Sequence, residues 1–111
     1  MGEGETEQTM AEWVKIGTKP ELPETGEARE FAVGNKVVCV ANVDGIWSAM
    51  DNMCRHHGGP LGQGVVIDGK VVCPWHGWEY DAMTGACKFG AEFTVPVYPI
   101  RVDGDDVWVQ L

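Results

Sequence analysis

Hydrophobic residues in this chain fall into short segments that are separated by turn-forming pairs. The segments are rich in Val, Ile and Trp, which favour the pleated surface of a β-sheet. No stretch repeats its apolar residues at helical spacing. The pattern therefore predicts short β-strands at residues 13–16, 36–41, 46–49, 65–67, 70–72 and 107–109.

The pairs between these segments are typical of hairpin turns, in which one or both residues adopt a positive φ. They are Gly34-Asn35, Asp44-Gly45, Asp68-Gly69, Thr84-Gly85 and Asp103-Gly104. Fifteen glycines and six prolines are spread along the chain, which argues against long helices. The fold class predicted is all-β, an antiparallel sandwich or small barrel.

The two ends of the pattern suggest one domain with a tail. Residues 1–10 contain three glutamates and two glycines without apolar periodicity, so a flexible tail is expected there. Residues 11–111 are expected to form a single domain, because 111 residues with 44% hydrophobic content suffice for one core.

The net charge of the chain limits the kinds of partner that it can bind. The chain has 8 Lys and Arg against 17 Asp and Glu, a net charge of −9, which disfavours nucleic acid and anionic membranes and favours a basic protein partner. There is no basic leader and no apolar run of the roughly 20 residues that cross a bilayer. A cytoplasmic location is expected.

Two segments carry candidate chemistry. Residues 54–60 read Cys-Arg-His-His-Gly-Gly-Pro and residues 73–78 read Cys-Pro-Trp-His-Gly-Trp, so C-x-H is followed after sixteen residues by C-x2-H. Each segment offers one thiolate and one imidazole, and the glycines let the backbone approach closely. The predicted hairpin 65–72 would bring the segments together. The candidate metal ligands are Cys54, His56, Cys73 and His76.

Two metal sites agree with this donor set. A [2Fe–2S] cluster can take both cysteines on one iron and both histidines on the other. Structural zinc also accepts two cysteines and two histidines. In the sequences of zinc fingers, however, cysteine is usually paired with cysteine and histidine with histidine, and a helix carries the histidines. The mixed pairs and the absence of a predicted helix favour the cluster, whereas zinc predicts a colourless protein.

The two segments resemble the cluster-binding loops of the Rieske family, and the strand pattern over residues 13–111 is similar to a Rieske domain. The resemblance implies an antiparallel fold with a two-loop subdomain that binds one [2Fe–2S] cluster. Cys54 and Cys73 would bind the inner iron. His56 and His76 would bind the outer iron near the surface, where electrons enter and leave.

Departures from the respiratory Rieske proteins indicate a subtype. Gly59 and Trp75 occupy the positions of a loop disulfide in that group, and Trp78 stands where it has a serine. Fewer hydrogen bonds to the cluster lower the potential, so we expect the lower part of the roughly −150 to +300 mV range of Rieske centres. The phenol of Tyr80 could donate to a cysteine sulfur or simply fill the core.

Histidine count limits the function. Only His56, His57 and His76 are present, so a second iron site with two histidines cannot be assembled beside the cluster. No G-x-G-x-x-G follows a predicted strand. The resemblance therefore implies an electron carrier without catalysis, which passes single electrons from a flavin reductase to a terminal oxygenase. A monomer is the simplest oligomeric state to expect. The alternative is a small Rieske subunit of an assimilatory nitrite reductase-like enzyme.

Other conspicuous residues have simpler interpretations. We expect His57 to be a solvent-facing polar residue, and Cys39 and Cys87 to be structural thiols. Trp75 and Trp78 flank His76 and could shield the cluster from water. By analogy with the family, Pro60 and residues 95–99 are expected to form further walls.

Overall fold

The structure is a computed structural model that describes residues 12–111. Within that range the chain forms β-strands and short 3-10 helices, without an α-helix. The helices are η1 (Lys19–Glu21), η2 (Leu61–Gln63) and η3 (Ala91–Phe93). The strands are β2 (Trp13–Thr18), β3 (Ala28–Val33), β4 (Lys36–Val43), β5 (Ile46–Asp51), β6 (Val65–Ile67), β7 (Lys70–Val72), β8 (Glu79–Asp81), β9 (Val97–Tyr98), β10 (Ile100–Asp103) and β11 (Asp106–Gln110).

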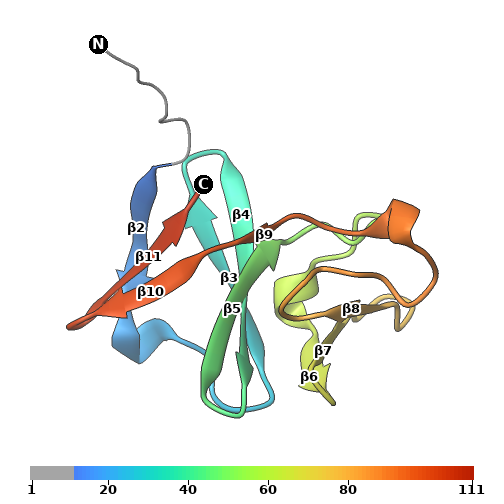
Figure 1. Cartoon of the computed structure of the whole chain (residues 1–111), viewed down its shortest axis with the longest axis horizontal. Coiled ribbons are helices and arrows are strands. Elements are labelled where there is room, and N and C mark those ends of the chain that lie inside the picture. Colours follow the sequence, from blue (N-terminus) through green and yellow to red (C-terminus); the bar gives the residue numbers. More distant parts are fainter. Residues whose placement is uncertain (1–11) are drawn as a thin grey trace.

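Two antiparallel sheets form the body of the molecule (Figure 1). One has the order β10-β11-β2 and the other β3-β4-β5-β9. Buried side chains from both sheets meet between them and form the sandwich core. Its members are Leu22, Phe31, Val38, Val40, Ala49, Val107 and Val109.

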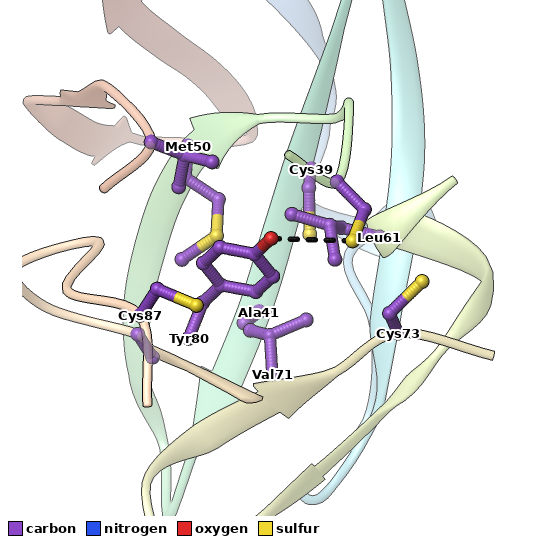
Figure 2. Close-up of a cluster of buried hydrophobic side chains, with 11 residues drawn as sticks. Cys39, Ala41, Met50, Leu61, Val71, Cys73, Tyr80 and Cys87 are labelled. Atoms are coloured by element: carbon purple, nitrogen blue, oxygen red, sulfur yellow. Dashed lines mark hydrogen bonds between the residues drawn. The ribbon is translucent and has the colours of Figure 1, made fainter. Parts of the chain in front are cut away.

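Residues 52–96 are inserted between β5 and β9 and form a small subdomain at one side of the sandwich (Figure 1). Its sheet has the order β6-β7-β8. A second core lies between this subdomain and strands β4 and β5, and Figure 2 shows its side chains. Cys39 and Met50 come from the sandwich, whereas Leu61, Val71 and Tyr80 come from the subdomain.

Strand β4 contributes to both cores. Val38 and Val40 lie in the sandwich core, while Cys39 and Ala41 lie in the second core. Successive side chains on a strand point to opposite faces, which explains the alternation. All four residues are 0% exposed, so β4 is covered on both faces.

The predicted all-β fold is confirmed, and the six expected segments all coincide with strands. Asp44 and Gly45 have φ of 53° and 89°, and Asp68 and Gly69 have φ of 52° and 76°, as a tight hairpin turn requires. Strands β3, β8, β9 and β10 were not expected. The predicted tail, residues 1–10, lies outside the described residues. In residues 12–111 no helix is long and apolar enough to cross a membrane.

Candidate metal centre

The two cysteine-histidine segments form loops of the same construction. The first follows β5 and the second joins β7 to β8. In the first, the Cys54 carbonyl accepts from Gly58 N at 2.9 Å and Cys54 N donates to Gly59 O at 2.9 Å. In the second, the Cys73 carbonyl accepts from Gly77 N at 3.0 Å and Cys73 N donates to Trp78 O at 2.8 Å.

A glycine completes each loop at the same place. Gly58 and Gly77 both have φ of 75°, a conformation that a side chain would strain. Each stands four residues after the cysteine of its loop and turns the chain back toward it. The glycines recognised in the sequence therefore present the cysteine and histidine of each loop in the same way.

The two thiols lie on the inner side of the loops. Cys54 is 2% exposed and Cys73 is 3% exposed. Burial raises the pKa of the Cys73 thiol and neighbouring Cys54 adds to the rise, although the backbone N–H groups of Trp75 and His76 act in the opposite direction. His56 N approaches Cys54 Sγ at 3.4 Å. A backbone N–H thus points at the Cys54 sulfur, and those of Trp75 and His76 lie near enough to the Cys73 sulfur to lower its pKa.

The imidazoles lie on the outer side. The ring centroids of His56 and His76 are 4.9 Å apart, with the rings nearly perpendicular. His76 is exposed and His56 is partly exposed. Desolvation lowers the pKa of His56, and the nearby His57 and His76 rings add to this. A lower pKa favours the neutral imidazole, which is the form that binds metal.

This donor set fits the cluster that the sequence predicted. Two buried thiols with backbone donors suit an iron whose charge needs screening, and two surface imidazoles suit a second iron. Within residues 12–111 no group of three or more His, Cys, Asp or Glu side chains is arranged to hold a metal ion. The thiols of both loops lie on the inner side and the imidazoles of both loops lie on the outer side, as a cluster with one iron bound by cysteines and one bound by histidines would need.

The backbone at Gly59 passes close to this site. A Cβ on Gly59 would lie 2.7 Å from Cys73 Sγ and 3.1 Å from the Trp75 ring. No side chain fits there without displacing the thiol. Gly59 and Trp75 thus face each other across the loops, and the indole occupies the space beside the glycine.

The Tyr80 hydroxyl contacts the same loop from the second core. Tyr80 is 0% exposed, and its oxygen accepts a hydrogen bond from Arg55 N at 2.8 Å. The oxygen lies 3.2 Å from Cys54 Sγ, the contact that is dashed in Figure 2. Because Arg55 N is a donor, the phenol proton is free to point at the sulfur. Burial, and then the contact with Cys54, raise the pKa of Tyr80.

The structure separates the two tryptophans of the second loop. The Trp78 indole stacks on the His56 imidazole, with centroids 4.4 Å apart and ring planes at 5°. Trp75 is 55% exposed and lies against Gly59. Of the two residues expected to shield the site, Trp78 covers a histidine ring directly.

Two phenylalanines that the sequence did not single out complete this side. Phe89 and Phe93 contact the Trp78 ring at centroid distances of 4.7 Å and 5.1 Å. Residues 89–93 thus contribute aromatic rings to this side of the site, while Val95 packs in the second core. The signal available in the sequence was a pair of aromatic residues after the Thr84-Gly85 turn.

The remaining candidates are structural or peripheral. Cys39 is 0% exposed, and burial, with Glu30 as a second cause, raises the pKa of its thiol to about 12. Cys87 is 9% exposed in the same core. Both therefore behave as small apolar side chains, as expected. His57 is exposed, with its ring centroid 3.9 Å from that of His56.

Comparison with known proteins defines the class. Residues 12–99 match the family model described as the Rieske [2Fe-2S] domain. The chain therefore belongs to the Rieske family of iron–sulfur proteins and carries one [2Fe–2S] cluster.

Particular relatives are small ferredoxins. The chain is 42% identical over 102 residues to the anthranilate 1,2-dioxygenase ferredoxin subunit of Burkholderia cepacia, which covers 89% of this chain and 93% of that protein. The ferredoxin of carbazole 1,9a-dioxygenase from Nocardioides aromaticivorans IC177 aligns with a TM-score of 0.76 at 28% identity, over 87% of this chain and 95% of that one.

A second similar structure contains a ferredoxin with its partner. In the complex of reduced oxygenase and oxidised ferredoxin in carbazole 1,9a-dioxygenase, the matched chain aligns with a TM-score of 0.72 at 26% identity, covering 88% of this chain and 92% of that one. Several other relatives are larger proteins, of which the chain spans 14% to 22%.

Proposed function

We propose that this protein is an electron carrier in which Cys54, Cys73, His56 and His76 hold the [2Fe–2S] cluster. The observation that carries the proposal is the polarity of the site, with both thiols at most 3% exposed and an imidazole of each loop at the surface. The bound cluster supplies one-electron oxidation and reduction. Similarity to ferredoxins along almost their whole length supports the same role.

The residues around the cluster have separate tasks in this function. Backbone N–H groups and the Tyr80 hydroxyl donate to the sulfurs and offset the added negative charge. The exposed edge of His76 offers a short path to a docked protein. Because the loops are closed by their own backbone hydrogen bonds, the electron can be gained or lost without rearrangement of the chain.

The partners we propose are a flavin reductase as donor and a terminal oxygenase as acceptor. The relatives named for dioxygenase systems support this, and one related ferredoxin is seen in a complex with its oxygenase. They favour the oxygenase pathway over a nitrite reductase-like enzyme. In this role the protein is a monomeric cytoplasmic carrier that performs no catalysis itself.

Low-temperature EPR of the dithionite-reduced protein tests the ligand assignment. A cluster with two histidine ligands gives a lower average g than an all-cysteine cluster. We expect His56→Ala and His76→Ala each to lose this signal, whereas His57→Ala, the matched control beside them, should keep it. Loss of the signal in His57→Ala with retention in His56→Ala would reverse the assignment.

Reconstitution of electron transfer with an oxygenase tests the proposed acceptor. The reduced protein is mixed with the oxygenase component of the Burkholderia cepacia anthranilate dioxygenase system and its substrate, and reoxidation of the cluster is followed by absorbance. We expect turnover-dependent reoxidation and product formation. A reduced cluster that remains reduced beside active oxygenase and substrate would contradict the oxygenase pathway.

A further inference from the structure

An aromatic wall lies against one face of His56. We use this name for Trp78, Phe89 and Phe93. The indole of Trp78 is parallel to the imidazole within 5° at 4.4 Å, and the two phenyl rings contact the indole at 4.7 Å and 5.1 Å. The Trp78 indole therefore packs against the His56 ring, and its contacts with the two phenyl rings hold the indole in place.

This wall joins parts of the chain that are otherwise separate. His56 belongs to the first loop, Trp78 ends the second loop, and the phenylalanines lie in the segment between β8 and β9. Trp78 is fixed within its own loop because its carbonyl accepts from Cys73 N at 2.8 Å. The stack is thus a non-covalent link between the two loops.

The position of the wall has an electrostatic consequence. Adding an electron makes the site more negative, and that charge is better stabilised by water than by hydrocarbon. Aromatic rings exclude water from the covered face, and the negative face of the indole lies toward the imidazole. Both effects disfavour the reduced state relative to an open site.

We propose that Trp78, backed by Phe89 and Phe93, is a positioning residue that fixes the ring plane of His56 and keeps the reduction potential low. The inference rests on the proposed role of His56 as a ligand of the outer iron. A purely structural role for Trp78 would change stability alone, without altering the potential or the EPR line shape.

The test compares Trp78→Leu, Trp78→Phe and Phe89→Leu by potentiometric titration and EPR at matched iron content. For Trp78→Leu we expect a more positive midpoint, equivalent to roughly a tenfold rise in the ratio of reduced to oxidised protein at fixed ambient potential, about 59 mV for one electron. Its EPR lines should broaden because the imidazole plane is no longer fixed. Trp78→Phe should restore most of the original potential and line width.

Two further variants serve as a milder change at the aromatic wall and as a control outside it. Phe89 is 55% exposed, so Phe89→Leu should fold, and a smaller shift in the same direction is expected. Trp47→Leu is the matched control, because Trp47 packs on the sandwich core; its potential and EPR spectrum should be unchanged.

The results separate this inference from the proposed function. Unchanged potential and line shape in Trp78→Leu would overturn the positioning role. If that variant loses its iron, the same result in Phe89→Leu would overturn it. A wild-type protein without a mixed-ligand EPR signal would instead refute the ligand assignment.

Discussion

The hydroxyl of Tyr80 bridges the backbone and a candidate iron ligand. It accepts from Arg55 N and lies 3.2 Å from Cys54 Sγ. A hydrogen bond to a ligand sulfur stabilises the reduced state, which carries the greater negative charge. The sequence predicted a low reduction potential because Trp78 stands where respiratory Rieske proteins have a serine. The hydrogen bond from Tyr80 would offset part of that decrease in potential.

We therefore predict that Tyr80→Phe lowers the reduction potential by about 60 mV, the value of a tenfold change for one electron. The free energy of unfolding should also fall by about 1–3 kcal/mol, because Arg55 N loses its partner. Potentiometric titration and denaturant unfolding measure the two effects. Tyr98→Phe, in β9, is the control and should leave the potential unaltered; an equal shift there would refute the assignment.

Gly59 gives a steric prediction. Its Cβ would lie 2.7 Å from Cys73 Sγ, so Gly59→Ala should sharply reduce the iron bound per chain, as measured by iron analysis and absorbance. Gly58→Ala provides the comparison, because its Cβ has room but its φ is 75°. That variant should lose about 1–2 kcal/mol of stability and keep its iron. Full iron occupancy in Gly59→Ala would contradict the steric explanation.

Local spacing was enough to predict the four candidate ligands, because each loop carries its own cysteine, histidine and turn glycine. The Tyr80 contact was one of two alternatives, since a sequence does not show which way a buried phenol points. Phe89 and Phe93 were missed for a different reason. Their contact with Trp78 depends on how the segment after β8 folds back, which no motif records.

The strands show a similar division. Segments such as 65–67 and 70–72 were predictable because branched apolar residues flank an Asp-Gly turn. Strand β3 (Ala28–Val33) mixes charged and small residues, and β9 (Val97–Tyr98) is held by pairing with β5 more than by its own composition. Each of these strands pairs with the edge of a neighbouring strand, β3 with β4 and β9 with β5. Such pairing depends on the whole fold and cannot be predicted from the local sequence.

The turn after β8 depends on one carboxylate. Asp81 Oδ1 accepts from Met83 N at 2.9 Å and from Thr84 N at 3.0 Å. The hydrogen bond from Met83 is the main cause that lowers the pKa of Asp81 in the folded protein. The turn leads into the segment that carries Phe89 and Phe93.

We predict that Asp81→Ala lowers the free energy of unfolding by about 1 kcal/mol, as loss of a capping side chain does. A pKa that is lower in the folded state stabilises the fold above the ordinary Asp pKa, and this contribution is lost as pH falls through that value toward the folded-state pKa. The difference between wild type and variant should therefore shrink in acid. Asp103→Ala, at another turn, is the control; a difference that is constant with pH would contradict the role.

Charge is distributed unevenly over the molecule. Acidic side chains gather at hairpin turns, at Asp44, at Asp68 and around the turn from β10 to β11, where Asp103 ends β10, Asp105 lies in the turn and Asp106 begins β11. Residues 54–60 and 73–78 contain no acidic side chain and only one cation. Around these loops Met53, Trp75 and Phe89 are each more than half exposed. The acidic side chains named here and these exposed apolar side chains thus lie on different segments of the chain.

We predict that the second-order rate of electron transfer to a basic partner falls as salt rises to about 0.15 M, where the Debye length is about 8 Å. The rate within the bound complex should not change, because salt screens the approach of two charged proteins and not the electron transfer that follows binding. Stopped-flow kinetics at increasing partner concentration separate the two steps. A second-order rate that is independent of ionic strength would refute electrostatic steering.

Strand β4 has one face in each core, so the stability of the iron centre is expected to depend on the stability of the sandwich. Melting of the sandwich would remove Cys39, Ala41 and Met50 from the core that packs on Tyr80. Loss of the iron would in turn leave the proposed ligands Cys54 and Cys73 as buried thiols beside the same core. On heating, bleaching and loss of β-structure should coincide in a single event. Since released iron does not return unaided, we expect the rate of irreversible bleaching to follow the rate at which the sandwich unfolds.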